Sequence, residues 1–163
     1  MAKDYVGTDL KITYTGILCL EEFYQHAKQW FVNQGYDWLE TKYREVELGK
    51  KKNIYITWSS EKKHNDYIKY TIDLTITIKD VEEIKAKKKN TCQCNIEVNV
   101  TGYLNSDYEE RWKDNKIIKF LKEAFNHYTD KPEMDKCTAT LQKEMQQFIN
   151  ELKAFFNVKK LDK

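Results

Sequence analysis

The chain has 163 residues, a net charge of +2 and 13% aromatic residues, which predicts one domain whose core is large enough to need no disulfide or metal. Glycine occurs five times and proline once, a composition that excludes a disordered or linker-rich chain. All but two of the 28 basic residues are lysine, the exceptions being Arg44 and Arg111. This scarcity of arginine, whose planar fork reads base edges, argues against sequence-specific recognition of nucleic acid.

The N-terminal part of the chain contains a strand followed by a helix. Apolar and polar residues alternate over 10–14, which predicts a short strand that ends at Gly16. The period then changes, because apolar residues recur at helical spacing over 20–34 and predict a helix whose apolar stripe faces a sheet. Gly35 follows as a suitable left-handed stop for that helix.

The middle of the chain alternates between apolar and polar residues in three segments, 54–59, 68–78 and 92–100. One apolar and one polar face per strand are typical of an antiparallel sheet that is covered on one side only. The glycine- and lysine-containing stretch 49–53 predicts a short hairpin turn before the first of these strands.

Two further segments fit neither the helical nor the strand period. Residues 36–48 are interpreted as an edge strand or a bulge. Residues 80–90 are interpreted as a short strand with a turn, or as a loop. The meander therefore has about four or five strands, depending on the second segment.

The last third of the chain is predicted to be helical. Ser106 and Glu109 have the spacing of a capping box, and the apolar stripe that follows them predicts a helix that runs to residue 128. Pro132 suits the first position of a final helix. That helix would have about 26 residues, which is long enough to cross the whole sheet.

We therefore predict a single α+β domain over residues 1–163, with an antiparallel meander sheet of about five to six strands and helices covering one of its faces. The predicted order is strand, helix, meander, helix and a long C-terminal helix. This order resembles that of helix-grip lipid-binding domains in topology alone. The resemblance implies a curved sheet that grips the last helix.

The sequence Cys92-x-Cys94 comes closest to a metal or redox motif, and Cys19 and Cys137 would complete a four-cysteine set. Zinc ligand pairs, however, lie on turns with about two to four residues between them. Here one residue separates two cysteines in a predicted strand, so both side chains share the buried face with Ile96. Each is best explained as a small buried hydrophobe, and no metal is predicted.

No enzymatic signature is present in the sequence. The three histidines, His26, His64 and His127, are scattered and form no HExxH motif. Adjacent glutamates are typical of helix starts or solvated surfaces, and the five glycines stand too far apart to cradle a phosphate. We therefore predict that the protein is not an enzyme and needs no cofactor.

The leading hypothesis is a binding or assembly domain. It would contact a protein partner, or a second copy of itself, through the edge strand predicted over 36–48 or through the polar face of the sheet. The residues predicted on that polar face are Tyr55, Thr57, Thr71, Asp73, Thr75, Asn95, Glu97 and Asn99.

Two alternatives stand beside this hypothesis. The first is a small-molecule or lipid carrier with a cavity between the sheet and the final helix, although the same side chains would also suit a solid core. Its walls would be Trp30, Trp58, Met145 and Phe148. The second is non-specific binding of a nucleic-acid backbone through lysine-rich turns, although such turns also keep a sheet protein in solution. The lysines concerned are Lys50, Lys51, Lys52, Lys62, Lys63, Lys85, Lys87, Lys88 and Lys89.

A cytoplasmic location is expected. No apolar run approaches the roughly 18 residues that a bilayer-spanning helix needs. The first residues lack the apolar centre of a signal peptide, and the final VKKLDK carries no lipidation motif.

Overall fold

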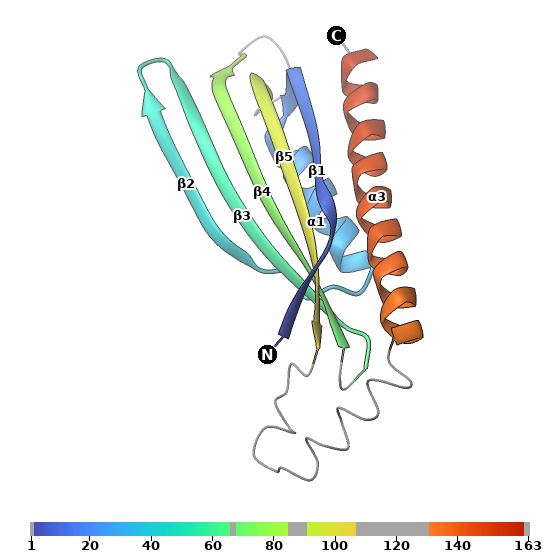
Figure 1. The fold of residues 1–163 in the computed structure, drawn as a ribbon. Helices are drawn as coiled ribbons and strands as arrows, with labels where there is room; N and C mark the ends of the chain where they lie inside the picture. Colours follow the sequence, from blue (N-terminus) through green and yellow to red (C-terminus); the bar gives the residue numbers. More distant parts are fainter. Residues whose placement is uncertain (1, 66–67, 85–90, 107–130, 162–163) are drawn as a thin grey trace.

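The computed structural model describes residues 2–65, 68–84, 91–106 and 131–161. They form an α+β fold in which one five-stranded antiparallel sheet carries two helices on one face (Figure 1). The strand order is β1-β5-β4-β3-β2, so β1 and β2 are the outer strands. The elements are β1 (Ala2–Cys19), α1 (Leu20–Asn33), β2 (Glu40–Leu48), β3 (Lys51–Lys63), β4 (Ile68–Glu83), β5 (Thr91–Ser106) and α3 (Lys131–Leu161).

Strands β2 to β5 form the predicted meander, and β1 closes the sheet by pairing with β5. The register confirms the alternation read from the sequence, because apolar residues meet in rows across the strands. One row runs from Ile56 to Ile76 and on to Val98 and Ile12. All four side chains are buried, so the apolar face of each strand points toward the helices.

Strands β1 and β4 are longer than predicted. β1 continues past Gly16 to Cys19, because Leu18 is buried and lies opposite Cys92 of β5. β4 runs to Glu83 through an irregularity near Asp80, whose φ is 55°. Residues 80–83 therefore belong to a strand, while 85–90 lie outside the described residues.

Within the segment 36–48, the residues from Glu40 to Leu48 form the edge strand β2, and its register is irregular, so the interpretation as an edge strand or a bulge is confirmed for this part. β2 pairs with β3, and the register shifts between Glu40 and Lys42. A single bridge between Asp37 and Glu61 precedes the strand. Gly49, with a φ of 71°, makes the tight turn from β2 into β3.

The helices follow the sequence signals where the structure describes them. α1 ends at Asn33, and Gly35 takes the left-handed conformation predicted for the stop, with a φ of 85°. α3 has 31 residues, which is longer than predicted. The helix predicted over 106–128 lies almost wholly outside the described residues.

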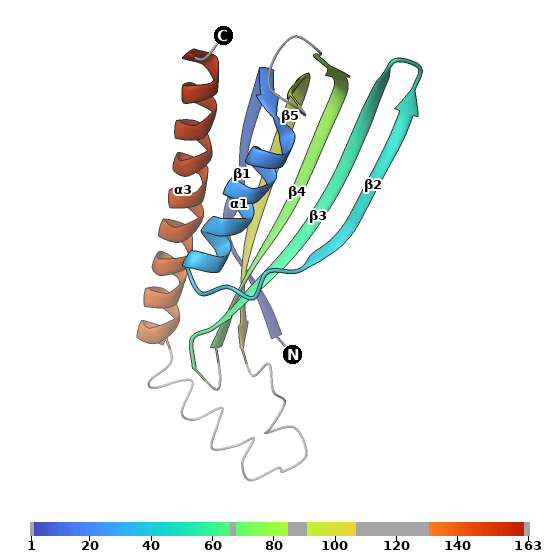
Figure 2. The ribbon, with the colours of Figure 1, turned by 180° about the vertical axis from the view of Figure 1, so that it is seen from behind.

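Helix α3 lies against β1 and β5, and α1 lies beside it on the same face (Figures 1 and 2). The backbones of α3 and β5 approach closely at Gly102 of β5, where a Cβ atom would collide with the side chains of Met145 and Leu141 of α3. Between the layers, Phe148 of α3 packs its ring 4.9 Å from that of Phe31 and 5.1 Å from that of Trp30. Aromatic side chains therefore fill the core between the helices and the sheet around Phe148.

The helical layer is displaced toward the β1 side of the sheet. Both ribbon views show the β2–β3 hairpin diverging from α1 toward the hairpin turn (Figures 1 and 2). The lower part of β3 is covered, since Trp58 packs against Phe31 and Tyr24 of α1. Near the turn, no helix among the described residues lies over β2 and β3, so the inner face of these two strands is left uncovered there by the helices.

Candidate ligand-binding groove

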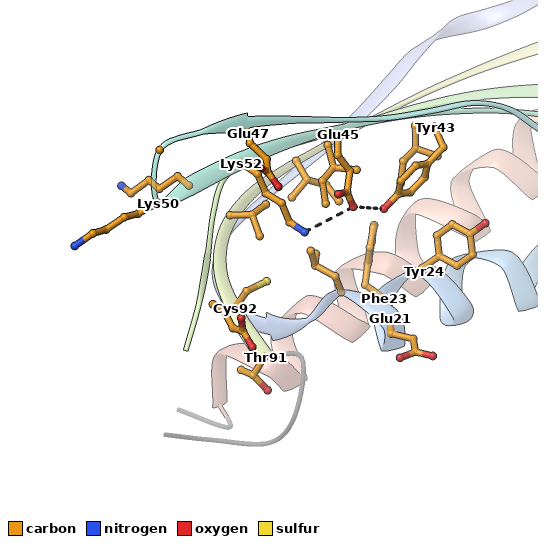
Figure 3. A pocket seen from close by; sticks show the side chains of 18 residues that line it. Glu21, Phe23, Tyr24, Tyr43, Glu45, Glu47, Lys50, Lys52, Thr91 and Cys92 are labelled. Carbon is orange, nitrogen blue, oxygen red and sulfur yellow. Dashed lines mark hydrogen bonds and ion pairs between the residues drawn. The ribbon is translucent and has the colours of Figure 1, made fainter. Parts of the chain in front are cut away.

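A groove of about 660 Å³ opens between the β2–β3 hairpin and the first turns of α1. Its bottom is apolar, because buried and partly buried apolar side chains of the sheet and the helix meet there. Ile54 comes from β3, Ile78 and Val81 from β4, and Leu20 and Phe23 from α1. The start of β5 closes one end with Thr91 and Cys92 (Figure 3).

The β2 side of the groove is a polar wall. Tyr43, Glu45 and Glu47 alternate along β2 and therefore share the face that lines the groove. The Tyr43 hydroxyl donates to Glu45 Oε1 at 2.8 Å, and the Lys52 ammonium lies 3.6 Å from the same oxygen (Figure 3). The groove thus has an apolar bottom beneath a row of hydrogen-bonding groups.

The α1 side of the groove ends in a second tyrosine–glutamate pair. The Tyr24 hydroxyl donates to Glu40 Oε1 at 3.0 Å, and the indole nitrogen of Trp58 donates to the same oxygen at 3.2 Å. Trp38 packs edge-on against both Tyr24 and Trp58. Glu40 is half-buried behind this aromatic cluster.

The two tyrosines have raised pKa values. Burial, together with the hydrogen bond to Glu40, raises the pKa of Tyr24 to about 12. Burial also raises the pKa of Tyr43 to about 12, with further contributions from the hydrogen bond to Glu45 and the charges of Glu45 and Glu40. At neutral pH both phenols are therefore protonated hydrogen-bond donors.

These pKa values predict a loss of stability at alkaline pH. Between pH 10.0, the ordinary tyrosine pKa, and about 12, the unfolded chain releases protons that the folded protein retains. Since the unfolded state then binds fewer protons, the free energy of unfolding falls as pH rises through this window. Denaturant titrations at several pH values should show this fall. It should be shallower in Tyr43→Phe, and an unchanged slope in that variant would contradict the assignment.

The side chains predicted to wall a cavity beneath the final helix lie in the core instead. Trp58 and Phe148 are 0% exposed, and Met145 is 2% exposed. Trp30 is 8% exposed and also lines a separate, polar hollow of about 510 Å³ between α1 and α3, beside side chains such as Gln29 and Asn150. None of the four residues lines the groove, because α3 packs directly on the sheet where the cavity was expected.

Two of the three predicted lysine clusters lie at opposite ends of β3. Lys50, Lys51 and Lys52 lie at the hairpin turn, at the mouth of the groove. Lys62 and Lys63 lie at the opposite end of β3. The remaining four, Lys85, Lys87, Lys88 and Lys89, lie outside the described residues.

Lys62 is an internal residue and not part of a surface patch. Its ammonium lies 2.5 Å from Glu144 Oε1 of α3, and both side chains are largely buried, at 21% and 13% exposed. The Tyr36 hydroxyl donates to the other oxygen of Glu144 at 2.5 Å. This cluster fastens α3 to β3 and to the segment that precedes β2.

The predicted polar face lies on the side of the sheet away from α1 and α3. We call it the helix-free face because no helix among the described residues covers it. Thr57, Thr75 and Asn99 lie side by side across three strands of this face. The other predicted members share it by alternation, and Thr71 is the one that is buried, with Asn105 donating to its hydroxyl at 2.5 Å. The predicted face residues are thus brought together by the fold.

The cysteines are free thiols, and Cys92, Cys94 and Cys137 are buried. A hydrogen bond to Cys92 and burial both raise the pKa of Cys94. Across the described part of the chain, no three histidine, cysteine or acidic side chains converge as metal ligands would. Neither α1 nor α3 has the length and apolar character of a bilayer-spanning helix.

No family model, curated protein sequence or solved structure matches this chain. The interpretation of the groove therefore depends on its own residues.

Sequence reasoning did not find the groove residues Tyr24, Tyr43 and Glu45. One signal was present. Residues 36–48 resist both periods because their inward-facing positions are polar, which is unusual for a strand whose inner face should be buried. An edge strand with hydrogen-bonding groups on its inner side indicates a part of the sheet that the helices leave uncovered.

Proposed function

We propose that the protein is a non-enzymatic binding domain that holds a small amphipathic molecule in the groove between the β2–β3 hairpin and α1. The observation that supports this proposal is the groove itself, with a volume of about 660 Å³, an apolar bottom and a polar wall. Ligand sites are typically concavities of about 300–1,000 Å³ in which a few polar groups orient an apolar body. The similarity of the element order to helix-grip lipid-binding domains is consistent with this role.

The state of the polar groups supports binding and not catalysis. Both tyrosines that line the groove are protonated at neutral pH, so neither is a ready base. Glu45 already accepts a hydrogen bond from Tyr43 and lies beside Lys52. Groups paired in this way are suited to holding a ligand in one orientation.

Titration with octanol tests the groove with a neutral amphipathic probe. We expect nuclear magnetic resonance shifts in isotope-labelled protein to concentrate at lining residues such as Phe23 and Ile78. Leu20→Ser should weaken octanol binding by roughly threefold or more, because Leu20 contributes apolar contact area at the groove.

Val32→Ser is the matched control, because Val32 lies near the other end of α1 and is 48% exposed. It should leave octanol affinity unchanged. Shifts scattered over the whole surface, or equal weakening in both variants, would rule out the groove as the binding site.

A protein partner that adds a strand to β2 is a second candidate, because one side of this edge strand pairs with β3 and no described element pairs with the other. Leu48, at the end of β2, is 57% exposed. Light scattering tests the version in which two copies pair through β2. A mass that stays at 19.6 kDa at high concentration would remove that version.

A further inference from the structure

Tyr24 and Tyr43 lie near each other at the α1 end of the groove (Figure 3). Tyr43 donates to Glu45 in the groove wall, and Tyr24 donates to Glu40 behind it. The geometry points to this end as a site for an organic ammonium group, so that the ligand is a cationic amphiphile. This inference rests on the proposed function, because the apolar part of such a ligand would occupy the bottom of the groove.

The charge balance of the groove favours a cation. The described lining carries four carboxylates, Glu21, Glu45, Glu47 and Glu83, against three ammonium groups, Lys50, Lys51 and Lys52. Lys52 forms an ion pair with Glu45, at 3.6 Å, and lies opposite Glu47 in the sheet register. The side chain of Lys50 extends outward from the hairpin turn (Figure 3), and the described lining holds one carboxylate more than it holds ammonium groups.

Glu40 adds negative charge from behind the aromatic cluster. Its carboxylate accepts two hydrogen bonds from neutral donors, Tyr24 and Trp58. No cationic side chain among the described residues forms an ion pair with Glu40. The nearby Lys28 lies over the ring of Trp38, 4.4 Å from its centroid. A half-buried carboxylate balanced only by neutral donors is stabilised by a cation that arrives with the ligand.

The rings of Tyr24 and Tyr43 supply a second attraction for an ammonium group. An aromatic face attracts organic cations through its quadrupole, and tyrosine rings beside carboxylates are well suited to substituted ammonium groups. Tyr43 is 52% exposed and so can be reached from solvent. The Lys28 ammonium, which lies over the ring of Trp38, already makes a cation–aromatic contact within this cluster. An anionic head group placed here would instead face the charges of Glu40 and Glu45.

Three probes with the same chain length test the inference: octyltrimethylammonium, octanol and octanoate, each kept below its micelle concentration. We expect the ammonium probe to bind roughly three- to tenfold more tightly than octanol, and octanoate to bind most weakly. The ammonium preference should shrink with added salt, because the carboxylates are partly exposed. Resonance shifts should centre on Tyr24, Tyr43 and Glu45.

Variants separate the charge from the apolar contact. Glu45→Gln should lower the affinity for octyltrimethylammonium by roughly threefold or more and leave octanol binding unchanged. Tyr43→Leu keeps apolar area but removes the aromatic face, and should reduce the same preference. Glu97→Gln, on the helix-free face, is the matched control, and it should affect neither probe.

The outcomes distinguish this inference from the proposed function. If octanol binds in the groove and the ammonium probe binds no more tightly, the cation site is wrong and the binding groove stands. If octanoate binds most tightly, the sign of the charge is wrong. If none of the three probes shifts the lining residues, both proposals fail together.

Discussion

Replacing Phe148 by alanine is expected to lower the free energy of unfolding by about 3–5 kcal/mol, the cost of removing a large aromatic side chain from a packed core. The ring is 0% exposed and lies 4.9 Å from Phe31 and 5.1 Å from Trp30, measured between ring centroids. It therefore joins α3 to α1 above the sheet. Urea titration followed by circular dichroism measures the change.

The Phe148→Ala variant also tests whether α3 closes the core. A side chain that lined a ligand cavity would contact fewer neighbouring side chains, so replacing it by alanine would lower the free energy of unfolding only slightly. Phe155→Ala, about two turns further along α3, is the matched control. Phe155 is only partly buried, beside Phe23 and His26, and its loss should cost about 1–2 kcal/mol. Equal and small effects in both variants would mean that α3 does not close the core.

The sheet and the long helix could be predicted because their signals are local. Alternation with period two records a strand that is buried on one face, and 68–78 shows it without interruption. The left-handed stop at Gly35 and the hairpin turn at Gly49 are equally local, since each needs a positive φ that glycine adopts without strain. These features required no knowledge of how the layers are placed.

The groove could not be predicted because it depends on how far the helical layer is displaced across the sheet. Tyr24 and Glu40 are sixteen residues apart and meet only when α1 folds back over β3. Aromatic residues at helical spacing do not reveal whether they line a cavity or fill a core, and for Trp58 and Phe148 the core is what formed. The lysine at position 62 was likewise indistinguishable in sequence from its exposed neighbours.

Replacing Lys62 by methionine is expected to lower the free energy of unfolding by about 2 kcal/mol. The change keeps the length of the side chain but leaves Glu144, which is 13% exposed, without its cation. Removing one partner of a buried pair costs about 3–5 kcal/mol, and the partial exposure of Lys62, at 21%, reduces that figure. Lys52→Met in the same strand is the control. It breaks a longer and more exposed contact, of 3.6 Å, and should cost less than about 1 kcal/mol.

A double-mutant cycle then isolates the interaction between β3 and α3. Glu144→Gln removes the charge of the carboxylate but retains a carbonyl that can accept the Tyr36 hydroxyl, which donates to Glu144 at 2.5 Å. The double variant Lys62→Met with Glu144→Gln should be more stable than the sum of the two single changes predicts, by about 1–2 kcal/mol, because neither charge is then left alone. Strict additivity would show that the two side chains do not interact in solution. In that case the attachment of α3 to the sheet would depend on its apolar face, with Phe148 at the centre.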